Sequence, residues 1–251
     1  EGIAYGIVVA QYSGLALSIF LWFRYYRRLL KYMDWREGLR LRLMKRFFNV
    51  NKDIFIRNFL NTAVYTAITF ISTGFGKDIL DTNTILINLF TFFSYMADGF
   101  GYAAEALVGR FTGAGNRNGL KLSVKYMFWW CFGIAAAFVA AYVLFWPEIL
   151  ALFKASEEVM GYARQYIVWI IIVPMVAFAP FLMDGILVGA TKTRILRNSM
   201  IISASLFFVT VFCLRGNMGK DALWLAFIVY LVSRDVTQLI MTRGLKVLYE
   251  P

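Results

Sequence analysis

The sequence predicts an all-α membrane protein, a polytopic membrane helical bundle with about seven transmembrane helices. Hydrophobic residues make up 60% of the 251 residues and charged residues 16%, with a mean hydropathy of +0.63. Soluble domains average about 45–50% apolar and about 25% charged residues. A soluble chain of this length has too little interior to bury so much apolar surface. The excess must therefore face lipid.

Seven runs are long and apolar enough to cross a bilayer, which takes about 20 residues in a helix. They cover 2–23, 54–75, 84–109, 124–146, 160–189, 196–214 and 221–242. Pro147 is predicted to end the fourth span, because proline disrupts the hydrogen bonds of a helix interior. The fifth run contains Pro174 and Pro180, and we expect it to be one kinked or broken helix rather than two spans.

The net charge of +11 indicates membrane topology rather than nucleic-acid binding, because most basic residues lie in the gaps between apolar runs. The gap 24–53 alone holds ten Lys and Arg residues, and every second gap after it is also basic. The intervening gaps are acidic or mixed. Since cytoplasmic loops carry the excess of Lys and Arg, we expect a multi-pass protein of the inner (plasma) membrane. Residue 1 is then outside and the C-terminus is cytoplasmic.

The composition also excludes several classes of chemistry. The sequence contains no histidine, which excludes serine–histidine triads, haem ligation by histidine and most zinc sites. Cys131 and Cys213 both lie within apolar runs, where a thiol packs as a small hydrophobe. We therefore expect no enzyme, no metal centre and no cofactor.

Three carboxylates lie within the predicted spans: Asp98, Glu105 and Asp184. A charge at bilayer depth costs about 2.5–3.5 kcal/mol on insertion scales, so each needs a compensating role. Asp98 and Glu105 are two helical turns apart and project from one helix face about 10 Å from each other. Our hypothesis is that the three acids bind a coupling cation or proton in a water-filled cavity. The alternative is a hydrogen-bonded or paired acid, with Arg110 as the partner of Glu105.

Other polar residues within the spans have weaker assignments. Asn58 and Asn61 are candidate cavity ligands for a cation or substrate, and interhelical hydrogen bonding is the alternative for both. Arg234 and Asp235 are expected to form a local pair or to extend toward the interface. Trp22, Trp146 and Trp224 lie near the ends of spans, where an interfacial aromatic belt is expected.

Two segments resemble the multidrug and toxic compound extrusion (MATE) family: DGFGYAAEALVGRFTGAGN at 98–116 and PFLMDGILVGATKTRILRNSM at 180–200. With R-N-F-L at 57–60, they resemble the branch of DNA-damage-inducible protein F. The resemblance covers essentially the whole chain and implies the C-terminal half of a two-lobed transporter.

The resemblance implies three parts for the chain. Residues 1–23 form the last helix of an incomplete N-terminal lobe, 24–53 a basic cytoplasmic linker and 54–251 a six-helix C-terminal lobe. The odd number of spans and the absence of an initiator Met agree with a missing N-terminal portion. For 24–53, a membrane-surface helix that binds anionic lipid is the alternative.

The resemblance also implies a cation-coupled multidrug efflux antiporter that exports cationic or amphipathic organic compounds by alternating access. Its coupling ion is H⁺ or Na⁺, and its partners are the bilayer and the missing N-terminal lobe, with no nucleic acid. Asp184 matches the acidic position of the tenth helix used for cation coupling in part of the family, which makes it a candidate Na⁺ ligand. Two alternatives stay open. One is a lipid-linked oligosaccharide flippase of the same superfamily, whose cavity would carry several Arg or Lys, and the other is a non-transporting membrane scaffold.

Overall fold

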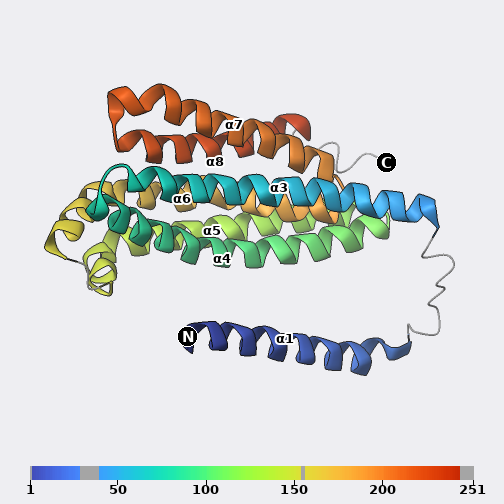
Figure 1. The fold of residues 1–251 in the computed structure, drawn as a ribbon. Helices are drawn as coiled ribbons and strands as arrows, with labels where there is room; N and C mark the ends of the chain where they lie inside the picture. The colour runs from blue at the N-terminus through green and yellow to red at the C-terminus, as the bar shows by residue number, and fades with distance from the viewer. Residues whose placement is uncertain (1, 29–39, 154–155, 244–251) are drawn as a thin grey trace. The chain divides into compact units, whose positions relative to one another are not determined.

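The computed structural model describes residues 2–28, 40–153 and 156–243. These residues form α1 (Gly2–Tyr26), α3 (Leu41–Thr73), α4 (Lys77–Gly113), α5 (Arg117–Ala151), α6 (Glu157–Gly189), α7 (Thr193–Met218) and α8 (Asp221–Met241) (Figure 1). The described part of the chain contains no strand. Each predicted span corresponds to one of these helices, so the all-α prediction is confirmed.

Six of the described helices are long and apolar enough to cross a membrane, and α4 is the exception. It carries Asp98 and Glu105 together with a run of glycines and alanines. The charged residues of this helix interrupt its apolar run. The glycines and alanines let it pack closely inside the bundle, because small side chains allow helix backbones to approach.

The chain divides into two compact units, Glu1–Asn49 and Val50–Pro251. The first unit contains α1 and the first turns of α3, and the second contains the rest of α3 and α4–α8. The predicted linker 24–53 includes the end of α1, and its last residues, 41–53, form the start of α3. Its residues 29–39 lie outside the described part of the chain.

Within the second unit, α6 is the central helix and packs against α4, α5, α7 and α8. Figure 1 shows these helices lying lengthwise beside one another, with α7 and α8 as a pair. The largest fully buried side chains include Phe93, Phe207, Phe227 and Tyr230. Because lipid is as apolar as leucine, van der Waals packing and polar contacts hold such helices together, rather than the hydrophobic effect.

Of the two proline predictions, the helix end at Pro147 needs correction, and the single span through Pro174 and Pro180 is confirmed but without a break. The helix does not end at Pro147, because α5 continues to Ala151 and only the backbone of Phe145 leaves helical geometry (φ −122°, ψ 18°). The local kink relieves the clash of the proline ring with the preceding turn. In α6, one helix runs from Glu157 to Gly189 through Pro174 and Pro180, both of which are buried. Packing of neighbouring helices around the two prolines compensates there for the hydrogen bonds that they cannot donate.

The prediction of an interfacial Trp224 is wrong. Its side chain is 1% exposed, and the indole N–H donates to Asn83 Oδ1 at 3.0 Å. Asn83 in turn donates to Ser72 Oγ at 2.8 Å. This hydrogen-bonded chain joins α8, α4 and α3. The tryptophan is buried because the amide of Asn83 satisfies its only donor.

Candidate functional site

A polar cavity of about 80 Å³ lies within the second unit, between α3, α4 and α6. It is lined by Arg57, Asp98, Gly101, Tyr102, Glu105, Phe181, Asp184, Gly185 and Val188. The structure therefore brings the three predicted carboxylates together in one cavity. Against these three acids the lining contains one basic side chain, that of Arg57, so its formal charge is negative.

The cavity is positioned by a crossing of α4 and α6 in which the two backbones touch. A methyl group on Gly185 would overlap the carbonyl group of Gly101, and one on Gly189 would come within 2.5 Å of the carbonyl oxygen of Glu105. Only glycine permits such an approach. The crossing brings Asp184 of α6 into the same cavity as Asp98 and Glu105 of α4.

Asp184 is the electrostatic centre of the site, because three other side chains donate to its carboxylate. Arg57 Nη2 and Arg234 Nη2 both donate to Oδ2, the second at 2.6 Å. Gln238 Nε2 donates to Oδ1 at 2.9 Å. The Asp184 side chain is 7% exposed. Charge-assisted bonds of this kind are the strong ones in proteins, so one buried acid joins α3, α6 and α8.

Arg234 is held deep in the bundle. Its side chain is 1% exposed, and its guanidinium carbon lies 5.6 Å from the ring centre of Phe181 and 5.5 Å from that of Tyr230. Aromatic faces attract a desolvated guanidinium. The prediction that Arg234 pairs locally with Asp235 is wrong, since its partner is Asp184, 50 residues away.

Asp98 and Glu105 differ from Asp184 in having no internal partner. No hydrogen bond or ion pair joins either carboxylate to another described residue. Asp98 is half-buried and Glu105 is exposed. Arg110 forms no ion pair with Glu105, so the structure does not supply the paired arrangement considered for that acid. Two carboxylates of the cavity are thus available to a ligand.

The two candidate asparagines of α3 have different surroundings. Asn58 is exposed and accepts a hydrogen bond from Arg57 Nη1 at 3.0 Å. Asn61 accepts one from the Tyr230 hydroxyl at 2.7 Å. Neither asparagine is among the residues that line the cavity. Asn61 makes the interhelical hydrogen bond that was the alternative to a ligand role, because it joins α3 to α8, whereas the bond of Asn58 stays within α3.

Sequence reasoning missed three residues of the site: Arg57, Arg234 and Gln238. Arg57 was noted only within the motif R-N-F-L, and Arg234 was assigned to a local pair. One signal that points to Arg234 is its depth, because an arginine near the middle of an apolar run requires a carboxylate partner. For Gln238 the sequence carries a weaker signal, its position one helical turn after Arg234.

A second ion pair attaches the start of the lobe to α7. Asp53 is 4% exposed and accepts from Arg197 Nη1 at 2.6 Å and from the Thr193 hydroxyl at 3.2 Å. Asp53, Arg57 and Asn61 are each four residues apart and therefore share one face of α3. Their partners lie on α7, α6 and α8, so α3 is attached to the bundle by a row of polar contacts.

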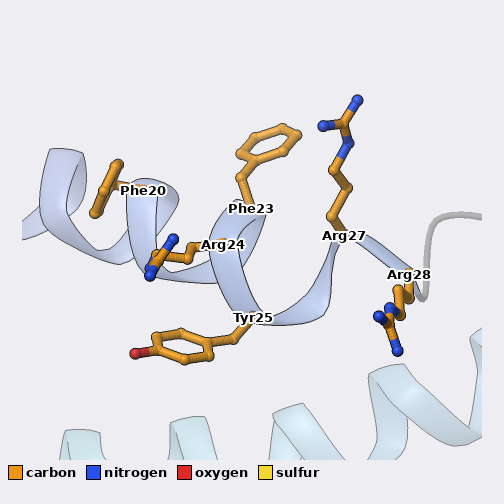
Figure 2. Close-up of a pocket in the computed structure, with 6 residues that line it drawn as sticks. All are labelled: Phe20, Phe23, Arg24, Tyr25, Arg27 and Arg28. Atoms are coloured by element: carbon orange, nitrogen blue, oxygen red, sulfur yellow. The ribbon is translucent and has the colours of Figure 1, made fainter.

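Other hollows differ in chemistry from this cavity. An apolar one of about 570 Å³ lies between α4 and α5 beside the kink at Phe145, lined by residues that include Phe92, Phe138 and Tyr142. At the end of α1, a hollow is lined by Phe20, Phe23, Arg24, Tyr25, Arg27 and Arg28. Figure 2 shows these side chains spreading outward from the helix, as expected where an apolar helix meets a charged interface.

The donors of the site are unsuited to a tightly bound metal. Among residues 2–28, 40–153 and 156–243, no group of three or more His, Cys, Asp or Glu side chains converges to hold a metal ion. The carboxylate oxygens of Asp184 already accept hydrogen bonds from two guanidinium groups and one amide group, so they are not free to coordinate a metal ion. While these donors are in place, the carboxylates open to a cation are Asp98 and Glu105.

Known proteins resemble this chain in sequence and in fold. The MatE family matches residues 54–213. The chain is 33% identical over 248 residues to "DNA damage-inducible protein F" of Escherichia coli (strain K12), and the match covers 94% of this chain and 51% of that protein.

Solved structures with a similar fold include an outward-facing conformation of a multidrug resistance MATE family transporter of the MOP superfamily, with a TM-score of 0.67 and 20% identity. A MOP superfamily transporter from Pyrococcus furiosus, for which a binding pocket of reverse polarity is described, has a TM-score of 0.68 and 19% identity. The matches cover 81% and 82% of this chain and 45% of each of those chains. The chain thus spans about half the length of the relatives it matches.

Proposed function

The chain belongs to the MatE family of membrane transporters, which are not enzymes, and on this basis we propose that it forms one lobe of a cation-coupled multidrug antiporter. The antiporter exports cationic or amphipathic organic compounds in exchange for H⁺ or Na⁺ by alternating access. Helices α3–α8 form the C-terminal lobe of this antiporter, and α1 is the last helix of its N-terminal lobe. The two lobes together form the transport pathway.

In the proposed orientation the protein lies in the inner membrane and its C-terminus is in the cytoplasm. It is supported by the basic gaps at 110–123 and 190–195, which follow α4 and α6 at the same end of the bundle, and by the basic composition of 24–53. Lys and Arg accumulate on the cytoplasmic side of membrane proteins. The cavity then lies toward the cytoplasmic end of α4, where cargo enters.

The observation that carries the proposal is the acidic lining of the cavity. Asp98 and Glu105 have no internal partner among the described residues, and Asp184 completes a set of three carboxylates between otherwise apolar helices. Unpaired acids inside a membrane are costly and are typical of ion and substrate pathways. Their negative charge attracts the coupling cation and the cationic cargo in turn, so that binding of one favours release of the other.

The arginines of the site have to be weighed against the alternative of a lipid-linked oligosaccharide flippase, because a pyrophosphate cargo requires several cationic ligands. Two arginines lie at this level, but Arg57 and Arg234 both donate to Asp184. Their charge is partly neutralised, and only Arg57 lines the cavity. The balance of charge favours a cationic cargo over a diphosphate.

The proposal is tested by Asp98→Asn in the complete gene product that contains this chain, reconstituted in liposomes. Export of a fluorescent cationic dye, driven by an imposed H⁺ or Na⁺ gradient, should fall at least tenfold. Because Asp98 has no internal partner, the folded yield should stay unchanged. Asp78→Asn removes an exposed carboxylate from the first turn of the same helix and should transport normally. Transport by Asp98→Asn at the normal rate, or uptake of a lipid diphosphate instead of the dye, would contradict the proposal.

A further inference from the structure

Two arginines bind the carboxylate of Asp184, and they differ in how deeply they are buried. Both guanidinium groups donate to the same oxygen, Oδ2. The Arg234 side chain is 1% exposed, whereas that of Arg57 is 20% exposed. Only Arg57 lines the polar cavity. The two positive charges exceed the single charge of Asp184, so one arginine is in excess at this carboxylate.

Arg234 is the arginine that cannot leave. Its guanidinium group lies close to the rings of both Phe181 and Tyr230, and its side chain is almost fully buried. Moving a buried guanidinium away from its carboxylate would leave both charges uncompensated, which is strongly unfavourable. Arg234 is therefore the permanent counter-ion of Asp184.

Arg57 is the arginine that can exchange partners. Apart from Asp184, its only hydrogen-bond partner is the exposed side chain of Asn58, and its Nε has no partner among the described residues. Asp98 lines the same cavity and has no internal partner. A side chain with several rotatable bonds can therefore turn from one carboxylate toward the other without movement of α3.

Asp184 remains compensated when Arg57 turns away. Arg234 still donates to Oδ2 at 2.6 Å, and Gln238 still donates to Oδ1 at 2.9 Å. The carboxylate then has one acceptor position on Oδ2 open toward the cavity. That position suits a charged donor, because ionised groups form the strongest hydrogen bonds with carboxylates.

We propose, on the basis of the proposed function, that Arg57 is a tethered cation: its guanidinium group occupies the Asp184 carboxylate until cargo binds there. A compact ammonium or guanidinium group of the cargo then displaces Arg57 toward Asp98. The cavity of about 80 Å³ has room for such a head group or a few waters, but not for a bulky aromatic cation. The apolar remainder of a cargo stays outside this cavity. Arg57 is thus a specificity-determining residue for the charged end of the cargo.

Binding of butylguanidinium to the purified gene product in detergent tests this proposal, with butylurea as the neutral ligand of the same shape. Calorimetry should show at least tenfold tighter binding of butylguanidinium to Arg57→Gln than to the wild type, because the internal competitor is gone. Arg57→Lys, which keeps the cation, should stay within threefold of the wild type. Arg117→Gln removes an exposed cation from the start of α5 and controls for the lost charge.

Tightening in Arg57→Gln alone supports the tethered cation, and equal or weaker binding by Arg57→Gln overturns it. If the wild type prefers butylguanidinium to butylurea but Arg57→Gln binds no tighter, only the role of Arg57 fails and the cationic cargo site stands. If neither protein prefers the charged ligand, the proposed function fails with it.

A second variant covers the case in which Arg57→Gln does not fold. In Asp98→Asn the displaced arginine has no carboxylate to turn to, so butylguanidinium should bind at least fivefold more weakly than to the wild type. Circular dichroism and size-exclusion chromatography report whether the variant is folded. Unchanged affinity in a folded Asp98→Asn protein overturns the proposal independently of Arg57→Gln.

Discussion

Gly185 of α6 lies directly against the carbonyl group of Gly101 of α4, with no space between the two backbones for a side chain. This contact sets how closely the two helices of the polar cavity approach. Since Asp184 immediately precedes Gly185, the same contact determines where the central carboxylate lies relative to Asp98.

We predict that Gly185→Ala destabilises the bundle by about 2 kcal/mol or more, because the added methyl group forces α4 and α6 apart. Thermal unfolding in detergent, followed by circular dichroism, measures the change. Gly133→Ala is the matched control, since a methyl group at that helical position meets nothing within 4 Å. Equal melting temperatures for the two variants would contradict the predicted overlap.

Arg234 and Arg57 should differ in their contribution to stability. Arg234→Gln is predicted to cost about 3–5 kcal/mol, because it leaves the buried Asp184 without its permanent counter-ion. Arg57→Gln should cost about 1 kcal/mol or less, since its side chain is partly exposed and the other two donors remain. Unfolding in SDS, monitored by tryptophan fluorescence, gives both values. The double variant Asp184→Asn/Arg234→Gln should lose less stability than the sum of the losses of its two single variants. If Arg57→Gln lowered the free energy of unfolding more than Arg234→Gln does, then Arg57 would be the permanent counter-ion of Asp184.

Asn83 should be required for the burial of Trp224. Asn83→Leu removes the acceptor of the indole N–H and the donor to Ser72, and an unsatisfied buried donor costs about 1–3 kcal/mol. We therefore expect a lower melting temperature and an altered tryptophan emission. Asn88→Leu replaces an exposed asparagine of the same helix and should leave both properties unchanged. If Asn88→Leu lowered the melting temperature and Asn83→Leu did not, the hydrogen bonds among Trp224, Asn83 and Ser72 would not be what stabilises the position of α8.

The pair of Asp53 and Arg197 should contribute a coupling free energy of about 1 kcal/mol, because Asp53 is buried while the Arg197 side chain is 24% exposed. The cycle of Asp53→Asn, Arg197→Gln and the double variant isolates this value from thermal unfolding data. Partial exposure makes the pair sensitive to salt. Coupling that is zero at low salt would exclude the pair as an attachment of α3 to α7.

The helices and the family could be predicted from the sequence because their signals are local. A run of about 20 apolar residues spans a bilayer wherever it occurs, and the segments at 98–116 and 180–200 carry the family resemblance within a few turns of helix. Asp98 and Glu105 could be placed on one face for the same reason, since seven residues make two turns. Proline effects were less predictable: α5 kinks near Pro147 and continues, whereas α6 runs through two prolines, because packing with neighbouring helices compensates for the missing hydrogen bonds.

The partners of Asp184 were beyond the reach of any local pattern. Arg57 is 127 residues before it in the chain, and Arg234 is 50 residues after it. Helices that are apolar on nearly every side give no sign of which side faces a neighbour, so the rotation of each helix about its axis depends on packing. Adjacent residues such as Arg234 and Asp235 point about 100° apart on a helix, and only the contact of α8 with α6 turns the arginine toward Asp184. The sequence thus determines that three acids lie within apolar spans. The glycine contacts of α4 and α6 bring the three acids to one cavity, and the packing of α3 and α8 against α6 determines that only Asp184 is bound by arginine.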